Sequence, residues 1–483
     1  MSSLRAPRAT TDAHHTVPPI ARLPNEILHQ IFSLLRPLQV ANIRLACKAF
    51  STIALQYLVP EIHLIFKPTS FDHLRLISEH PVLSQHVHTL FYEADSLEDV
   101  DSMKEWEENI FVPGWYNTVD CKLLPFLPPD ASKREERAYR RHMEKIRQAP
   151  RYLYSTGQLK KAYEEYRHFV WCQNYMRQYD YNSEVIREAM AKLPKLKTIE
   201  LSLLSCLRNG RSRKLENAFA KGLSVAFGEH GHGGSCGVGQ LRSLLVGASD
   251  AGLEIETLRC GSVQWQFFAE RDPVFDKLKH AVRCLHTLEF YITTRSDEDI
   301  DSEDLHYLET VRCAEYIEET GRLHDFITSA PQLENLTVQF DCDIEEPPAR
   351  LSDLVGHFSW QSLRLASFNM ISTTEEELMD FYERHAKTLR EIRIESMHLD
   401  YGSWASIFER IRKMLSLEKA TICGDLVAED PPESIYVGMP PECMIDGDIP
   451  GIGVAIEKYL VGSDEGPSSF NFADYESHDP EEH

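Results

Sequence analysis

The sequence predicts an α/β protein in which a small unit of three helices precedes a repetitive α/β solenoid, and a helical insertion interrupts that solenoid. Three observations lead to this fold class. Short segments with apolar stripes fill residues 21–60, a spaced apolar pattern recurs between residues 61 and 430, and residues 95–190 break the pattern. Apolar residues at regular spacings are the main sequence signal for secondary structure, and a supersecondary unit that recurs every ~20–50 residues indicates a stacked architecture.

Composition sets the class of protein. The chain has 483 residues, with 51 Lys or Arg and 75 Asp or Glu, so its formal charge is −24. This length suggests about two to four domains, and the acidic balance argues against a protein that coats nucleic acid or a membrane. The 11 scattered cysteines contain no CxxC motif and predict reduced thiols in a cytoplasmic or nuclear protein, or one found in both compartments. We expect no signal peptide and no membrane-spanning helix.

The N-terminal part begins with residues 1–20, which are polar and contain three prolines, so we expect a disordered arm. Three short helices are predicted next, over residues 23–35, 40–46 and 49–59. The first carries apolar residues on more sides than one small core needs, and Pro37 ends it. Because a unit of about 40 residues rarely buries enough surface to be stable alone, its apolar surface predicts an interface with a partner protein or with the rest of the chain.

The same residues resemble an F-box. The pattern Leu-Pro-x-Glu-Ile-Leu-x-x-Ile-Phe-x-x-Leu starts at Leu23, and Arg-Leu-x-Cys-Lys-x-Phe starts at Arg44. The resemblance spans residues 21–60 and implies binding to the Skp-type adaptor of a cullin-RING ubiquitin ligase and, through it, to a cullin. The family's adaptor-binding positions correspond to Leu23, Pro24, Glu26, Ile27, Ile31, Phe32, Leu35, Leu38, Leu45, Cys47 and Phe50. The start of the second helix is a weak match, and an ordinary amphipathic hairpin is the alternative.

From residue 61 onward, strand and helix patterns alternate. A strand is predicted at 61–66, and the triplet apolar-x-x-apolar-x-apolar begins at residues 87, 196, 241, 255, 285, 333, 363, 389 and 417. Helical patterns cover residues 304–329, 374–386 and 403–414. This alternation resembles degenerate leucine-rich repeats of fungal F-box proteins. The 14-residue step between 241 and 255 and the lack of an Asn ladder depart from that family, and a non-repetitive α/β domain is the alternative.

Together the two resemblances imply an N-terminal three-helix F-box followed by a curved leucine-rich-repeat-like α/β solenoid with a helical insertion. We expect the first strands in residues 61–94, the insertion in 95–190, the repeat-like domain in 191–430 and a C-terminal segment in 431–483, with an acidic tail from 463. In such repeats, residues between the inward positions of each strand line the concave face. The resulting candidates for substrate binding are Thr198, Glu200, Arg259, Glu289, Tyr291, Thr337, Gln339, Arg393, Glu395 and Thr421.

A glycine cluster at residues 228–239 contains His230, His232 and Cys236 and invites comparison with a phosphate-binding loop or a metal site. A helical pattern precedes the cluster and a predicted strand follows it. This order is the reverse of a phosphate-binding loop, and the usual lysine is missing. No fourth zinc ligand stands at a conventional spacing. We therefore interpret the cluster as a flexible surface loop.

No other motif indicates catalysis. The sequence contains neither GxSxG nor HExxH, and the acidic run at 297–304 lacks the glycine and spacing of a calcium loop. The basic run at 133–151 fits a solvated helix with ion pairs at i and i+4, with a nuclear import signal or an anion-binding patch as alternatives. The few arginines among the concave-face candidates do not indicate a phosphate-binding pocket.

The sequence thus predicts a non-catalytic substrate-receptor subunit of an SCF-type ubiquitin ligase. We expect no catalytic residue, no metal and no cofactor. The expected partners are the Skp-type adaptor, a cullin through that adaptor, and a protein substrate, without nucleic acid or membrane. A protein-binding scaffold with no role in ubiquitin ligation is the main alternative. An enzyme ranks third, with the glycine cluster as its only support.

Overall fold

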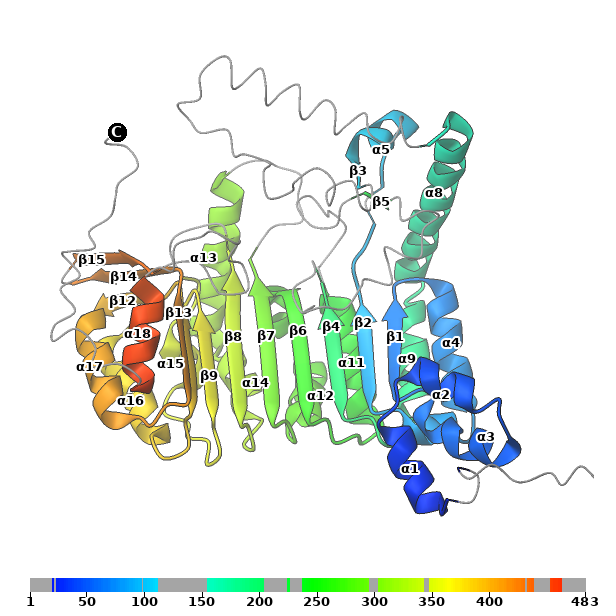
Figure 1. Ribbon diagram of the computed structural model, residues 1–483. Helices are drawn as coiled ribbons and strands as arrows, with labels where there is room; N and C mark the ends of the chain where they lie inside the picture. Colours follow the sequence, from blue (N-terminus) through cyan, green and yellow to red (C-terminus); the bar gives the residue numbers. More distant parts are fainter. Residues whose placement is uncertain are drawn as a thin grey trace, which may run out of the picture.

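The computed structural model describes residues 20, 23–97, 99–111, 154–203, 224–225, 237–294, 303–342, 347–430, 432–437 and 452–462. Within these residues, nine strands form an open sheet in which every neighbouring pair is parallel and the spatial order follows the chain (Figure 1). The strands are β1 (Glu61–Ile65), β2 (Thr89–Glu93), β4 (Thr198–Ser202), β6 (Thr257–Gln264), β7 (Thr287–Thr293), β8 (Asn335–Asp341), β9 (Leu365–Asn369), β11 (Glu391–Glu395) and β13 (Lys419–Cys423).

One row of helices covers one face of this sheet, and each helix contacts the next in chain order. The row consists of α4 (Pro68–Glu79), α9 (Tyr181–Met190), α11 (Val238–Asp250), α12 (Asp272–Val282), α14 (Arg322–Thr328), α15 (Leu351–Val355), α16 (Glu375–His385) and α17 (Trp404–Met414). Alternate residues of each strand point to the helices, as the two-residue period of a strand requires. Leu258 and Cys260 of β6, for example, are fully buried in the main core. The residues between them therefore lie on the opposite face of the sheet.

The strands are joined by a repeated backbone arrangement at their N-terminal ends. His88 and Thr89 both donate N–H groups to the carbonyl oxygen of Pro60, and Lys197 and Thr198 donate in the same way to that of His88. Equivalent paired bonds precede each later strand of the nine-stranded sheet. Each strand therefore stacks on its neighbour in the same way, which explains why one apolar pattern recurs along the sequence.

Eight of the nine predicted triplets supply strands of this sheet, and the ninth prediction is wrong. Residues 241–246, expected to be a strand, lie in helix α11. Leu241 and Leu244 are three residues apart, a spacing that also suits a helix, and buried Leu245 and Ala248 continue the helical period. The short step from 241 to 255 is thereby explained, because the chain passes from β4 to β6 through a helix. The helical predictions at 304–329, 374–386 and 403–414 correspond to α13 (Glu303–Thr320) with α14, to α16 and to α17.

A second, smaller sheet follows the last strands of the main one. After β9, β11 and β13 the backbone turns at one residue with positive φ, at Met370 (54°), Ser396 (44°) and Gly424 (76°). The chain then enters β10 (Ser372–Thr374), β12 (His398–Tyr401) or β14 (Asp425–Glu429), and β15 (Pro432–Tyr436) pairs antiparallel with β14. A Cβ on Gly424 would collide with the Ser396 hydroxyl. Glycine is therefore required at this corner by both its φ and its close neighbour.

Helix α18 (Ile452–Val461) lies against β13, the last strand of the main sheet. The Ile422 N–H of β13 donates to Glu457 Oε1 at 3.0 Å. A Cβ on Gly453 would collide with the Ile422 carbonyl oxygen, so the start of the helix approaches the strand closely. An uncovered edge strand invites pairing with other chains, and α18 covers this one. The sequence pattern of residues 431–483 did not predict this helix.

The predicted insertion contains α5 (Met103–Asn109), the short β3 (Ile110–Phe111) paired with β5 (Ser224–Val225), and α8 (Thr156–Gln178). These helices share a small core of their own, and Figure 1 shows α8 standing beyond the C-terminal ends of the strands. Buried Gln173 ties α8 to the sheet, because it accepts from Leu97 N–H at 2.8 Å and donates to the Phe66 carbonyl at 3.0 Å. Helix α9, which we expected within the insertion, packs instead in the helix row of the main core.

Some predictions fall outside the described residues. They concern residues 1–19 of the expected arm, the basic run at 133–151, residues 228–236 of the glycine cluster, residues 297–302 of the acidic run and the tail from 463. Among the described helices, none combines the length and the apolar character needed to cross a membrane.

Candidate functional site

The N-terminal unit has a small core of its own. It is built from α1 (Asn25–Ser33), α2 (Pro37–Ile43) and α3 (Lys48–Ala54), followed by a 3₁₀ turn at Leu55–Tyr57. Pro37 occupies the first turn of α2, where its fixed φ is favourable, so the second helix starts earlier than predicted. Leu28 and Phe32 of α1 meet Phe50 and Ile53 of α3. The rings of Phe32 and Phe50 pack edge to face, with centroids 5.8 Å apart.

Apolar side chains that this core does not use remain exposed on the same unit. Leu34, Leu38 and Leu45 are 86%, 75% and 77% exposed, and Leu23 and Ile27 are exposed as well. They come from the start and end of α1, from α2 and from the turn before α3. We call these five residues the apolar F-box surface. Because burying a leucine is worth about 1.5–3 kcal/mol, these exposed side chains would be stabilised by contact with another apolar surface.

The predicted adaptor-binding residues divide into three groups. Exposed on the unit are Leu23, Pro24, Glu26, Ile27, Leu38, Leu45 and Cys47, whereas Ile31 and Leu35 are partly buried. Phe32 and Phe50 are only 2% and 5% exposed and belong to the internal core. In the described structure these two side chains support the unit from inside, and their contact with an adaptor stays a prediction. Leu34 was missed, although it follows Ile27 and Ile31 on one helical stripe.

The candidate substrate-binding residues all lie on the sheet face opposite the helix row, which we call the open face. Strand register aligns most of them in two rows. The first runs through Glu200, Arg259, Glu289, Thr337, Ser367, Arg393 and Thr421, and the second contains Tyr291, Gln339, Asn369 and Glu395. Thr198 precedes Glu200 by two residues on the same face of β4. Ser367 and Asn369 were missed, although the rule that selected the others also selects residues between inward positions of β9.

Ion pairs organise this face. Arg259 lies between two carboxylates: its Nη1 is 3.4 Å from Glu200 Oε1 and its Nε is 3.2 Å from Glu289 Oε1. Burial raises the pKa of Glu289, Arg259 opposes this shift, and the nearby Glu200 adds to it. Farther along, Arg393 Nη2 lies 2.8 Å from Glu395 Oε2. Both arginines of the two rows are therefore engaged with carboxylates of the same face.

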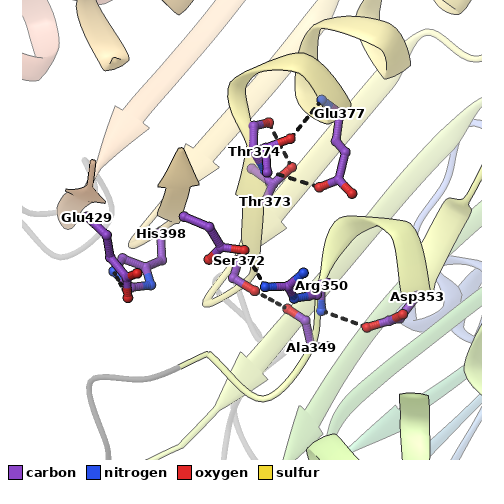
Figure 2. A network of polar contacts seen from close by, with 10 residues as sticks. Ala349, Arg350, Asp353, Ser372, Thr373, Thr374, Glu377, His398 and Glu429 are labelled. Atoms are coloured by element: carbon purple, nitrogen blue, oxygen red, sulfur yellow. Dashed lines mark hydrogen bonds and ion pairs between the residues drawn. The ribbon is translucent and has the colours of Figure 1, made fainter. Parts of the chain in front are cut away.

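Figure 2 shows a separate polar network that joins α15 and α16 to the second sheet. Arg350 Nη2 lies 2.5 Å from Asp400 Oδ2, and the Arg350 N–H donates to Asp353 at 3.2 Å. Thr374 and Glu377 exchange hydrogen bonds in a capping box at the start of α16. Burial raises the pKa of Asp353 and that of Asp400. These contacts satisfy helix ends and strand termini, so we interpret the network as structural.

Metal chemistry finds no support in the part of the chain that the structure describes, where no group of His, Cys, Asp and Glu side chains is arranged to hold an ion. His230, His232 and Cys236 lie outside that part.

Comparison with known proteins identifies the N-terminal unit. Residues 20–59 match the F-box-like family, the same residues that form the three helices and the apolar F-box surface. A search of curated proteins finds no match to the chain. The chain therefore contains an F-box-like domain on a mixed α/β body with a parallel sheet, and this domain points to substrate recognition in SCF-type ubiquitin ligation. F-box domains generally bind Skp-type adaptors.

Proposed function

We propose that this chain is a substrate-receptor subunit of an SCF-type E3 ubiquitin ligase. The apolar F-box surface binds the Skp-type adaptor and, through it, a cullin. The open face of the sheet binds a protein substrate. The observation that carries the proposal is the match at residues 20–59 to a unit whose core is complete and whose leucines still face outward.

The body of the protein supports the second half of the proposal. Its strands follow chain order and repeat one backbone arrangement, as expected for a curved leucine-rich-repeat-like solenoid, in which each repeat contacts mainly its neighbours. Such a solenoid offers an extended surface for another protein. We propose that the chain performs no bond chemistry itself. It raises the effective concentration of substrate lysines near the charged ubiquitin carrier by holding both partners, in the cytoplasm, the nucleus or both.

The lifetime of bound proteins tests this function. Cells would express either the wild-type chain or the variant Leu38→Asp/Leu45→Asp, which changes two exposed leucines and leaves the sheet intact. Proteins captured by both chains would be identified, and their half-lives measured. A receptor predicts that at least one shared partner lives longer with the variant, because the partner is bound but no longer delivered.

Unchanged half-lives for all shared partners would contradict the proposal and favour the scaffold alternative. The matched control is Leu76→Asp, which alters a 65% exposed leucine on α4, outside the F-box-like domain. It should behave as the wild type.

A further inference from the structure

The open face between β4 and β9 carries two carboxylates for one arginine, and it holds buried polar atoms that have no hydrogen-bond partner. Glu200 and Glu289 share the single guanidinium of Arg259, so this triad carries a net negative charge. The side chains of Glu289 and Arg259 are 30% and 41% exposed, whereas that of Glu200 is 12% exposed, so a ligand reaches the triad through Glu289 and Arg259. An acidic cluster on a solvated surface is common, so the triad needs an independent sign of a ligand.

That sign comes from β9. Ser367 is only 3% exposed, and its hydroxyl has no hydrogen-bond partner. Asn369 Oδ1, two residues farther along the same face, is also buried without a partner. A buried polar atom that is left unpaired destabilises the folded state. Both atoms can accept a hydrogen bond from a donor placed over the face.

We propose that the open face from β4 to β9 binds a Lys- or Arg-bearing segment of the substrate protein, an inference that rests on the proposed receptor function. A lysine ammonium offers three donors and an arginine guanidinium five, with no acceptor. Such a group satisfies both features of the face, the shared carboxylates and the unpaired acceptors. An acidic segment would be repelled by the net negative charge of the triad.

The length of the segment follows from the sheet. Four strand spacings separate β4 from β9 in the strand order, which is about 19 Å at ~4.8 Å per spacing. An extended chain advances about 3.3 Å per residue, so roughly six residues cross this part of the face. The ligand is therefore a short extended segment with two or three cationic side chains.

Peptide binding to the full chain tests the proposal. The probe is a fluorescent decapeptide in which Lys alternates with Thr, and the comparison peptides carry Gln or Glu in place of Lys. Fluorescence anisotropy should show the tightest binding for the Lys peptide and weakening with added salt. The variant Glu200→Gln/Glu289→Gln should bind at least about tenfold more weakly, because each carboxylate that becomes an amide loses a charge-assisted hydrogen bond to the peptide.

A matched control separates this site from general attraction to an acidic protein. Glu188→Gln/Glu409→Gln removes the same charge from exposed ion pairs on α9 and α17 and should bind as tightly as the wild type. Asn369→Ala should weaken binding severalfold without lowering thermal stability, because its Oδ1 has no partner to lose. Equal binding of the Lys and Gln peptides, or equal weakening by the open-face and control variants, would overturn the inference.

Adaptor binding is measured on the same protein. Adaptor binding without Lys-peptide binding would refute only the basic-segment inference. Peptide binding without adaptor binding would uphold the surface and refute the ligase role.

Discussion

We predict that the hydrogen bond between Glu457 of α18 and the backbone of β13 stabilises the last strand of the main sheet by a measurable amount. Glu457 accepts from Ile422 N–H at 3.0 Å, and Ile422 is buried. Glu457→Ala leaves that N–H unpaired and should cost about 1–3 kcal/mol. Glu457→Gln keeps an acceptor oxygen at the same position. The Gln variant should therefore be at least as stable as the wild type.

The pH dependence of stability distinguishes Glu457→Gln from the wild type. Burial raises the pKa of Glu457, with the Ile422 N–H and Lys419 acting in the opposite direction. The ionised form is therefore penalised in the folded state relative to the unfolded state. Any stability advantage of Glu457→Gln should be complete above the raised folded pKa. It should disappear as the pH falls below the unfolded value of about 4.3.

Urea unfolding and hydrogen exchange of β13 measure these effects. Exchange of the Ile422 amide should be accelerated in Glu457→Ala, with about a tenfold change for each 1.4 kcal/mol lost. The Gln variant should stay protected. If the Ala and Gln variants show equal protection, the hydrogen bond does not hold α18 to the sheet, and the account of this edge is wrong.

Three further variants test other parts of the structure. Glu375 accepts from the Ser406 hydroxyl at 2.6 Å and from Arg410 at 2.9 Å, so Glu375→Ala should cost about 2–3 kcal/mol in urea unfolding. Burial raises the pKa of Glu375, but these hydrogen bonds outweigh burial, and the net shift of the pKa is downward. The stability lost in Glu375→Ala relative to the wild type should therefore become smaller as the pH falls below about 4. A loss of stability that does not change with pH would contradict this. Gln173→Leu should cost about 2–4 kcal/mol, because it leaves the Leu97 N–H and the Phe66 carbonyl unpaired. Proteolysis of α8 should then be faster. Unchanged proteolysis would show that Gln173 does not hold α8 to the sheet. Phe32→Ala should cost about 3–5 kcal/mol and unfold the F-box-like unit, monitored by hydrogen exchange, while the sheet stays protected; loss of protection in both would show one shared core.

The strands were predictable because their signal is local and repeated. Each apolar triplet places two residues toward the helix row and one at the turn before the strand. Leu333, Leu336 and Val338 therefore predict β8 from the local sequence alone. The same spacing suits a helix, and Leu241 shows the resulting ambiguity. It could have been resolved by continuing the count, since Leu245 and Ala248 extend the helical period.

Features that depend on tertiary contact were not predictable. The covering of β13 by α18 depends on Gly453 and Glu457 meeting a strand some 30 residues earlier in the chain, and neither residue belongs to a recognisable motif. Phe32 and Phe50 match F-box positions, but only the packing of α1 on α3 shows that their rings meet in the core of the unit. The alignment of Glu200, Arg259 and Glu289 likewise required the strand register.

The central claim is that the exposed leucines of the F-box-like domain bind a Skp-type adaptor. Titration calorimetry of the full chain with the purified adaptor tests it most directly, with wild type, Leu38→Asp/Leu45→Asp and Leu76→Asp compared. Wild type and Leu76→Asp should bind alike. The double variant should unfold at the same temperature but bind at least about 100-fold more weakly, because each leucine contributes about 1.5–3 kcal/mol on burial. Absence of binding by the wild type, or equal binding by the double variant, would contradict the account.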